Sequence, residues 1–111
     1  MWLTPYDIAD AWPPVEIELA GRVEVGGRKD WAWARLGAPV PLAGAMRDRV
    51  LVAARHVDED LWERPSRWPV HVFVATAADE DATSLDVGEV VVAAWGLLHE
   101  TRERAETDAN G

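Results

Sequence analysis

The chain has 111 residues, of which 49% are hydrophobic and 28% charged, and it contains no cysteine. This composition predicts one globular domain over residues 1–111, with a frayed tail at about 107–111. The missing cysteines exclude disulfides and thiolate zinc sites. No apolar run is long enough to span a membrane, and the amino terminus lacks the features of a signal peptide. We therefore expect a cytoplasmic protein without membrane contact.

Charge is distributed unevenly along the chain. Residues 1–57 hold seven acidic and seven basic side chains, whereas residues 58–111 hold thirteen acidic and four basic ones. The second half therefore carries the whole net charge of −9. Within the first half, residues 22–55 contain seven basic and three acidic side chains, a local charge of +4. We expect the folded molecule to be electrically two-sided.

The beginning of the chain predicts a short helix followed by a strand. Thr4 followed by Pro5 is typical of a helix start, and the helix would end near Trp12 because two prolines follow. Apolar and polar residues alternate over Val15–Val25, which predicts a half-buried strand. Gly21 in the middle of this strand indicates a bend, a bulge or a close backbone approach.

Three further segments have clear patterns. Two glycines at 26–27 predict a tight turn, and Trp31–Leu36 is expected to be the return strand of a hairpin. Gly37–Pro41 should be extended because of its two prolines. Val70–Ala75 is predicted to be a central strand because both of its faces are apolar. An acidic loop over Ala77–Asp86 should follow it.

Two segments fit either a helix or a strand. Over Leu42–Leu61 the apolar residues recur every three or four positions, as in an amphipathic helix, but a cluster of branched residues favours a strand at about 50–57. Over Val87–Ala105 the spacing also fits one helical face. Three consecutive valines there favour a strand that continues into a helix near Leu97. We favour the strand in both segments.

Together these elements predict a mainly β fold. The expected architecture is a small five-stranded barrel-like domain of the oligonucleotide-binding or SH3-like kind, with a short N-terminal helix and a C-terminal helix. The stretch from Glu16 to Leu36 resembles such a barrel, since it combines a glycine-interrupted strand, a basic turn and an aromatic strand. The alternative is an α+β fold, in which residues 42–61 and 85–105 form two long helices on a three-stranded sheet.

Seven tryptophans are the main compositional anomaly. Burial tendencies predict that most of them lie in the core. Trp31, Trp33 and Arg35 would share one face of a regular strand, next to the basic turn that holds Arg28 and Lys29. Such a face suits stacked bases and phosphates. The opposite face is rich in alanine and would make a thin core, so inward-pointing tryptophans are the competing interpretation.

The sequence lacks the residue patterns that carry catalysis or bind a cofactor. Its two serines lie outside any glycine elbow, and it has no phosphate-binding loop or dinucleotide motif. His56 with the acids at 58–60 is the only local histidine and carboxylate cluster, and a solvated turn explains it. We expect His71 in a core or edge position and His99 on the polar face of the terminal helix. The sequence thus predicts a non-enzyme without metal or cofactor.

The leading functional expectation is a non-catalytic protein–protein binding module, such as an accessory, inhibitory, immunity-like or phage-assembly component. Exposed indoles anchor interfaces, and acidic side chains steer a basic partner. A related version has the acidic half imitating nucleic acid. The expected anchors and steering residues lie in one charged stretch, namely Trp62, Trp68, Asp58, Glu59, Asp60 and Glu63.

The alternative is a single-stranded nucleic-acid-binding barrel, in which bases stack on aromatic residues and phosphates meet basic ones. The net charge of −9 opposes the approach of such a polyanion. We also expect a symmetric homodimer, with Trp62, Trp68 or Trp95 buried across the two-fold axis. The expected nucleic-acid face consists of Arg22, Arg28, Lys29, Trp31, Trp33 and Arg35.

Overall fold

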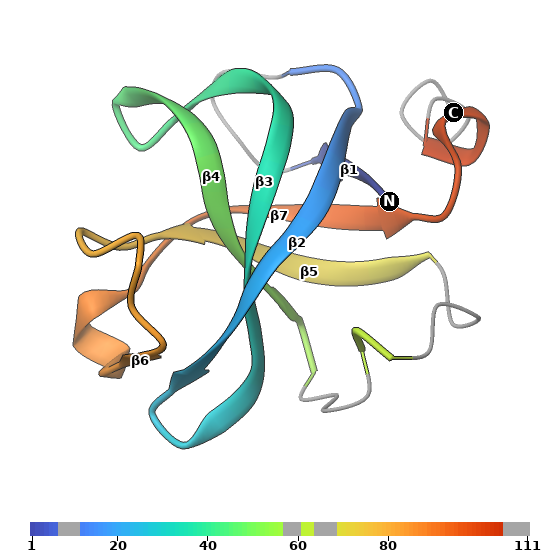
Figure 1. The fold of residues 1–111 in the computed structure, drawn as a ribbon. Helices are drawn as coiled ribbons and strands as arrows, with labels where there is room; N and C mark the ends of the chain where they lie inside the picture. Colours follow the sequence, from blue (N-terminus) through green and yellow to red (C-terminus); the bar gives the residue numbers. More distant parts are fainter. Residues whose placement is uncertain (7–11, 57–60, 64–68, 106–111) are drawn as a thin grey trace.

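The computed structural model describes residues 1–6, 12–56, 61–63 and 69–105, and most of them lie in β-strands (Figure 1). The expected mainly β class is therefore confirmed. A short 3-10 helix, η2 (Val87–Glu89), precedes the last strand, and a helical turn at 102–105 follows it. The strands in chain order are β1 (Trp2–Pro5), β2 (Val15–Val25), β3 (Arg28–Leu42), β4 (Ala45–Ala54), β5 (Val70–Thr76), β6 (Ser84–Leu85) and β7 (Val91–His99).

The strands form a sheet that closes on itself (Figure 1). In the order β2, β3, β4, β5, β7, each strand pairs antiparallel with the next. β1 pairs with both β7 and β2, which completes a barrel-like ring of six strands. β6 adds in parallel beside β2. The expected count of five strands is corrected, because Trp2–Pro5 supplies the strand that closes the ring.

The expected N-terminal helix is wrong at its start. Thr4 and Pro5 belong to β1, where Thr4 is paired with Leu97 and Pro5 with Gly96 of β7. Pairing with a neighbouring strand outweighs the local helix-start signal, because it satisfies the backbone of the whole segment. The remainder of that helix, residues 7–11, lies outside the described residues, as does the tail 107–111.

Neither long helix of the α+β alternative is present among the described residues, since the two segments contain β4 and β7. In β4, Val50 and Val52 are buried in one core cluster, and Leu51 and Ala53 in another. Burial on both faces leaves no polar alternation to reveal a strand, so the segment also fitted a helical spacing. The expected helix start near Leu97 is wrong too, because β7 continues to its end at residue 99.

The glycine in the middle of β2 marks a β-bulge, which is one of the three features that the sequence left open for it. The register of β2 against β3 shifts between Leu19 and Gly21. Before this shift Ile17 packs in one core cluster, and after it Val23 packs in the other. Residues two apart normally share a face, so the extra residue in the bulge transfers the apolar side of β2 from one core to the other.

The described residues form two apolar cores. The first is built from side chains of all six ring strands, whereas the second lies on the other face of β3, β4 and β5. Residues 77–90, here named the covering segment, supply Ala77 and Leu85 to this second core. The segment is held by backbone hydrogen bonds from Glu24 N to Thr83 O, 3.0 Å, and from Gly26 N to Leu85 O, 3.1 Å. It therefore shields one side of the sheet from water.

Candidate functional site

The first set of residues expected to bind a partner is only partly described. Trp62 is half-buried, and its indole Nε1 donates a hydrogen bond to the backbone oxygen of Asp30 at 2.8 Å. Glu63 is exposed, and one of its carboxylate oxygens lies 3.4 Å from the guanidinium of Arg22. The other members of the set, Trp68, Asp58, Glu59 and Asp60, lie outside the described residues.

The second set, the expected nucleic-acid face, has its two indoles covered. Trp31 and Trp33 are 5% and 4% exposed and pack in the second core beneath the covering segment. The covering segment contacts Trp33 directly, and the Phe73 ring stacks on Trp31, so neither indole is open to a stacking base. Among the basic members, Arg22, Lys29 and Arg35 are exposed. Arg28 is instead engaged in an ion pair with Asp30, a residue that is fully buried.

A different group of aromatic side chains remains accessible on the outside of the ring. Its central contact joins Phe73 of β5 and Trp95 of β7, which are directly paired in the sheet. Their ring centroids lie 4.6 Å apart, and both side chains are half-buried. On its other side Phe73 stacks on the buried Trp31, with a centroid distance of 6.1 Å. Favourable ring packing of this kind holds the exposed aromatics in fixed positions.

Tyr6 and His71 extend this group toward the end of β1. Tyr6 is 49% exposed, and its backbone N donates to the oxygen of Trp95 at 3.0 Å. The Tyr6 hydroxyl lies 3.2 Å from Nδ1 of His71, and the two rings meet edge to face. His71 shares the outer side of β5 with Phe73, two residues along the strand. It is exposed and thus does not occupy a core position.

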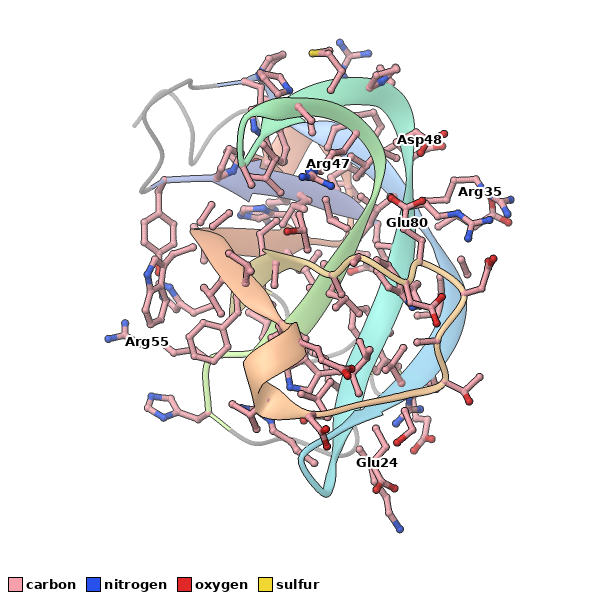
Figure 2. The ribbon with its side chains drawn as sticks, turned by 90° about the vertical axis from the view of Figure 1, so that its left-hand side faces the viewer. Glu24, Arg35, Arg47, Asp48, Arg55 and Glu80 are labelled. Atoms are coloured by element: carbon pink, nitrogen blue, oxygen red, sulfur yellow. The ribbon has the colours of Figure 1, made fainter. Side chains whose placement is uncertain are left out.

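Arg55 completes the group. Its guanidinium carbon lies 4.9 Å from the centroid of the Trp95 ring, within the range of a cation–π contact. Among the described residues, no hydrogen bond or ion pair engages this guanidinium, so its N–H donors are available to a ligand. Figure 2 shows Arg55 projecting from the edge of the molecule opposite Arg35. We name Tyr6, Arg55, His71, Phe73 and Trp95 the aromatic face.

Sequence reasoning missed this face because its members come from four separate parts of the chain. The available signal was the two-residue spacing of His71 and Phe73, which places both on one side of a strand. The expectation for His99 is corrected as well. It lies in β7 and is 2% exposed, because the strand runs on where a helix was expected.

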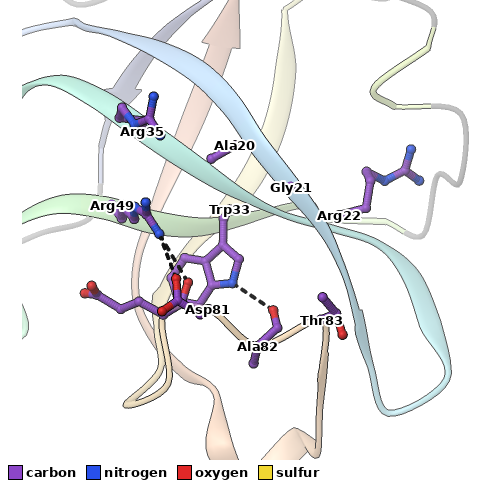
Figure 3. Close-up of a pocket in the computed structure, with 10 residues that line it drawn as sticks. Ala20, Gly21, Arg22, Trp33, Arg35, Arg49, Asp81, Ala82 and Thr83 are labelled. Atoms are coloured by element: carbon purple, nitrogen blue, oxygen red, sulfur yellow. Dashed lines mark hydrogen bonds and ion pairs between the residues drawn. The ribbon is translucent and has the colours of Figure 1, made fainter.

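A second feature is a pocket of about 250 Å³ beside the β2 bulge. Its walls come from Ala20–Arg22 of β2, from β3 and β4, and from residues 80–83 of the covering segment. Figure 3 shows Arg35 and Arg49 on one side of the Trp33 indole and Arg22 on the other. The pocket therefore combines an aromatic wall with several guanidinium groups.

Within the part of the chain that the structure describes, no group of three or more histidine or acidic side chains is placed to hold a metal ion. The same residues include no helix with the length and apolar character needed to cross a membrane. Comparison with protein-family models, with curated proteins and with solved structures gave no match to this chain.

Proposed function

We propose that this protein is a non-catalytic binding module that acts by contact with another protein, and that the aromatic face is its contact surface. The observation that carries the proposal is an accessible, rigidly packed aromatic cluster next to a guanidinium with unused donors. Tryptophan, tyrosine and arginine are the side chains most enriched at the energetic centres of protein interfaces. Their fixed ring packing also lowers the entropy lost on binding.

The chemistry of the aromatic face defines the partner's complementary surface. Phe73, Trp95 and Tyr6 offer apolar area, so the partner should insert aliphatic or aromatic side chains between them. Arg55 should meet a carboxylate or backbone carbonyl oxygens on the partner. At longer range the net charge of −9 favours approach of a partner that is basic overall. The aromatic face would thus contact the partner, whereas the acidic residues elsewhere on the molecule would steer its approach.

The test uses two substitutions on the face, Tyr6→Ala and Arg55→Glu. Each has a matched control on a different part of the surface: Met46→Ala removes a side chain that is 66% exposed, and Arg104→Glu reverses another exposed arginine. Tagged forms of all five proteins are used to isolate partners from the cells that encode the chain. The protein retained by the wild type is then purified and titrated calorimetrically.

We expect both face variants to weaken binding of the purified partner by at least about tenfold, as for a central interface residue. Both controls should bind like the wild type. The proposal fails if Tyr6→Ala and Arg55→Glu bind the partner with the affinity of the wild type. It also fails if the two control variants lose as much affinity as these two face variants.

Self-association competes for the same face, because a second copy of the chain could cover the aromatic rings across a two-fold axis. Sedimentation equilibrium over a range of concentrations distinguishes the two uses. If the wild type is a dimer and Tyr6→Ala is a monomer, the face serves self-association. That result would contradict the proposal that its partner is a different protein. A monomer for both proteins would leave the face to a different protein and would count against the homodimer expected from the sequence.

A second candidate function is binding of single-stranded nucleic acid. The contact between Arg55 and Trp95 favours it, since a guanidinium next to a half-buried indole can serve a phosphate and a stacked base together. The net charge of −9 opposes it. Titration of tryptophan fluorescence with an oligonucleotide at low salt tests this candidate. Quenching that Trp95→Phe and Arg55→Glu both abolish would favour nucleic acid over protein.

A further inference from the structure

We propose that the pocket beside the β2 bulge binds the phosphate group of a small ligand between Arg35 and Arg49. This site is separate from the aromatic face: Figure 2 shows Arg35 and Arg55 at opposite edges of the molecule. The proposal therefore does not depend on the proposed function.

The first observation is a pair of like charges. Arg35 of β3 and Arg49 of β4 are directly opposite each other in the sheet. Opposed residues of an antiparallel pair project from the same face, so the two guanidinium groups share one side of the sheet. Like charges in this arrangement repel and destabilise the pair. An anion bound between the two guanidinium groups would attract both of them, and this attraction would outweigh their mutual repulsion.

The second observation is how little the protein itself does to neutralise these charges. Glu18 of β2 is opposite Arg35 on its other side in the sheet, but among the described residues Arg35 makes no hydrogen bond or ion pair. Arg49 uses Nη1 for two long contacts, to the backbone oxygen of Glu80 at 3.5 Å and to the carboxylate of Asp81 at 3.4 Å, and the Asp81 side chain is 93% exposed. A long ion pair to a solvated carboxylate contributes little. An incoming anion can therefore replace Asp81 at small cost.

The buried pair of Arg28 and Asp30 provides a contrast within the same molecule. Nη2 of Arg28 donates to one carboxylate oxygen of Asp30 at 2.8 Å, and Nε donates to the other carboxylate oxygen. Arg28 also donates to the backbone oxygen of Ala54. The protein thus engages three of the five N–H groups of this arginine, which serves the fold. Arg35 and Arg49 keep most of their donors free for a ligand.

The third observation is the space beside the two arginines. Gly21 is paired with Trp33, so a side chain at position 21 would project from the same face as that indole. A Cβ added at Gly21 would meet no atom within 4 Å. The bulge and the missing side chain thus leave room next to Trp33. A volume of about 250 Å³ accommodates a phosphate group with a small organic substituent.

The charges identify the ligand's chemical class. Two guanidinium groups match the two negative charges of a phosphate monoester, and each can present a pair of parallel N–H donors to its oxygens. The same pocket is lined by Glu80 and Asp81 on the covering segment. These acids repel a long polyanion but leave room for one compact anion next to the arginines. A small phosphate-bearing ligand fits better than a nucleic acid.

Isothermal titration of the full chain tests the site with inorganic phosphate, a nucleoside monophosphate and acetate, at matched ionic strength. Arg35→Gln and Arg49→Gln remove one charge each, and Gly21→Leu fills the space beside Trp33. Arg104→Gln is the matched control, because it removes an exposed arginine near the end of the described chain. Tighter binding of the nucleoside monophosphate than of inorganic phosphate would show that the phosphate is carried on an organic group.

We expect saturable binding of phosphate by the wild type and by Arg104→Gln, and affinity reduced by about tenfold or more in the other three variants. No binding to the wild type would overturn the proposal. So would acetate binding as tightly as phosphate, or affinity unchanged in both Arg35→Gln and Arg49→Gln.

Discussion

The indole Nε1 of Trp33 donates a hydrogen bond to the backbone oxygen of Ala82 at 3.2 Å. This contact ties the covering segment to the sheet that it shields, and it uses the polar atom of a tryptophan that is otherwise buried in apolar surroundings. The second core, the pocket beside the β2 bulge and the position of the acidic residues 79–81 all depend on where this segment lies.

Trp33→Phe removes the donor while keeping a large apolar ring. We expect the free energy of unfolding to fall by about 1–3 kcal/mol, because the hydrogen bond is lost and some apolar contact with it. Amide hydrogen exchange should accelerate within residues 77–90. The control is Trp95→Phe, a substitution on the aromatic face that leaves the Trp33 contact intact. Equal exchange rates in residues 77–90 of both variants would contradict the assigned role.

Asp30→Asn tests the buried ion pair. Asp30 is fully buried, so Arg28 would lose the charge that compensates its own, and the free energy of unfolding should fall by about 2–4 kcal/mol. The matched control is Glu63→Gln, which breaks the exposed pair with Arg22 and should cost less than about 1 kcal/mol. Urea denaturation measures both values. Equal losses in the two variants would mean that burial does not distinguish the pairs.

Gly96→Ala tests closure of the ring by β1. A Cβ at this position would lie 3.1 Å from both Thr4 O and Leu3 Cδ1, closer than ordinary van der Waals contact. The strand β1 would have to shift, and we expect a loss of about 1–3 kcal/mol in the free energy of unfolding. Gly88→Ala is the control, since its Cβ would meet no atom within 4 Å. A lower midpoint of thermal unfolding for Gly88→Ala than for Gly96→Ala would argue against this packing of β1.

Much of the fold was predictable because its signals are local. The alternation over Val15–Val25, the glycine turn and the apolar strand at Val70–Ala75 each depend on residues a few positions apart. Gly21 also indicated an irregularity in its strand, and the tertiary pairing decided that it is a bulge. These features follow from backbone conformation and from which side chains avoid water.

Closure of the ring and the number of strands depended on contacts between distant segments. Thr4 and Pro5 fit a helix start by local preference, but pairing with β7 makes them a strand. In β4 both faces are buried, one inside the ring and one under the covering segment, so periodicity alone could not separate strand from helix. Local preferences are worth less than the burial and pairing of a whole strand.

The sequence alone determined the tryptophan surplus and the uneven charge, and it favoured the mainly β class over the α+β alternative. Only the tertiary structure decided which aromatic side chains are accessible: it buries Trp31 and Trp33 and leaves Tyr6 and Trp95 in contact with water. The reason is physical. Exposure of a side chain depends on what packs over it, and the segment over Trp33 comes from a part of the chain nearly fifty residues away.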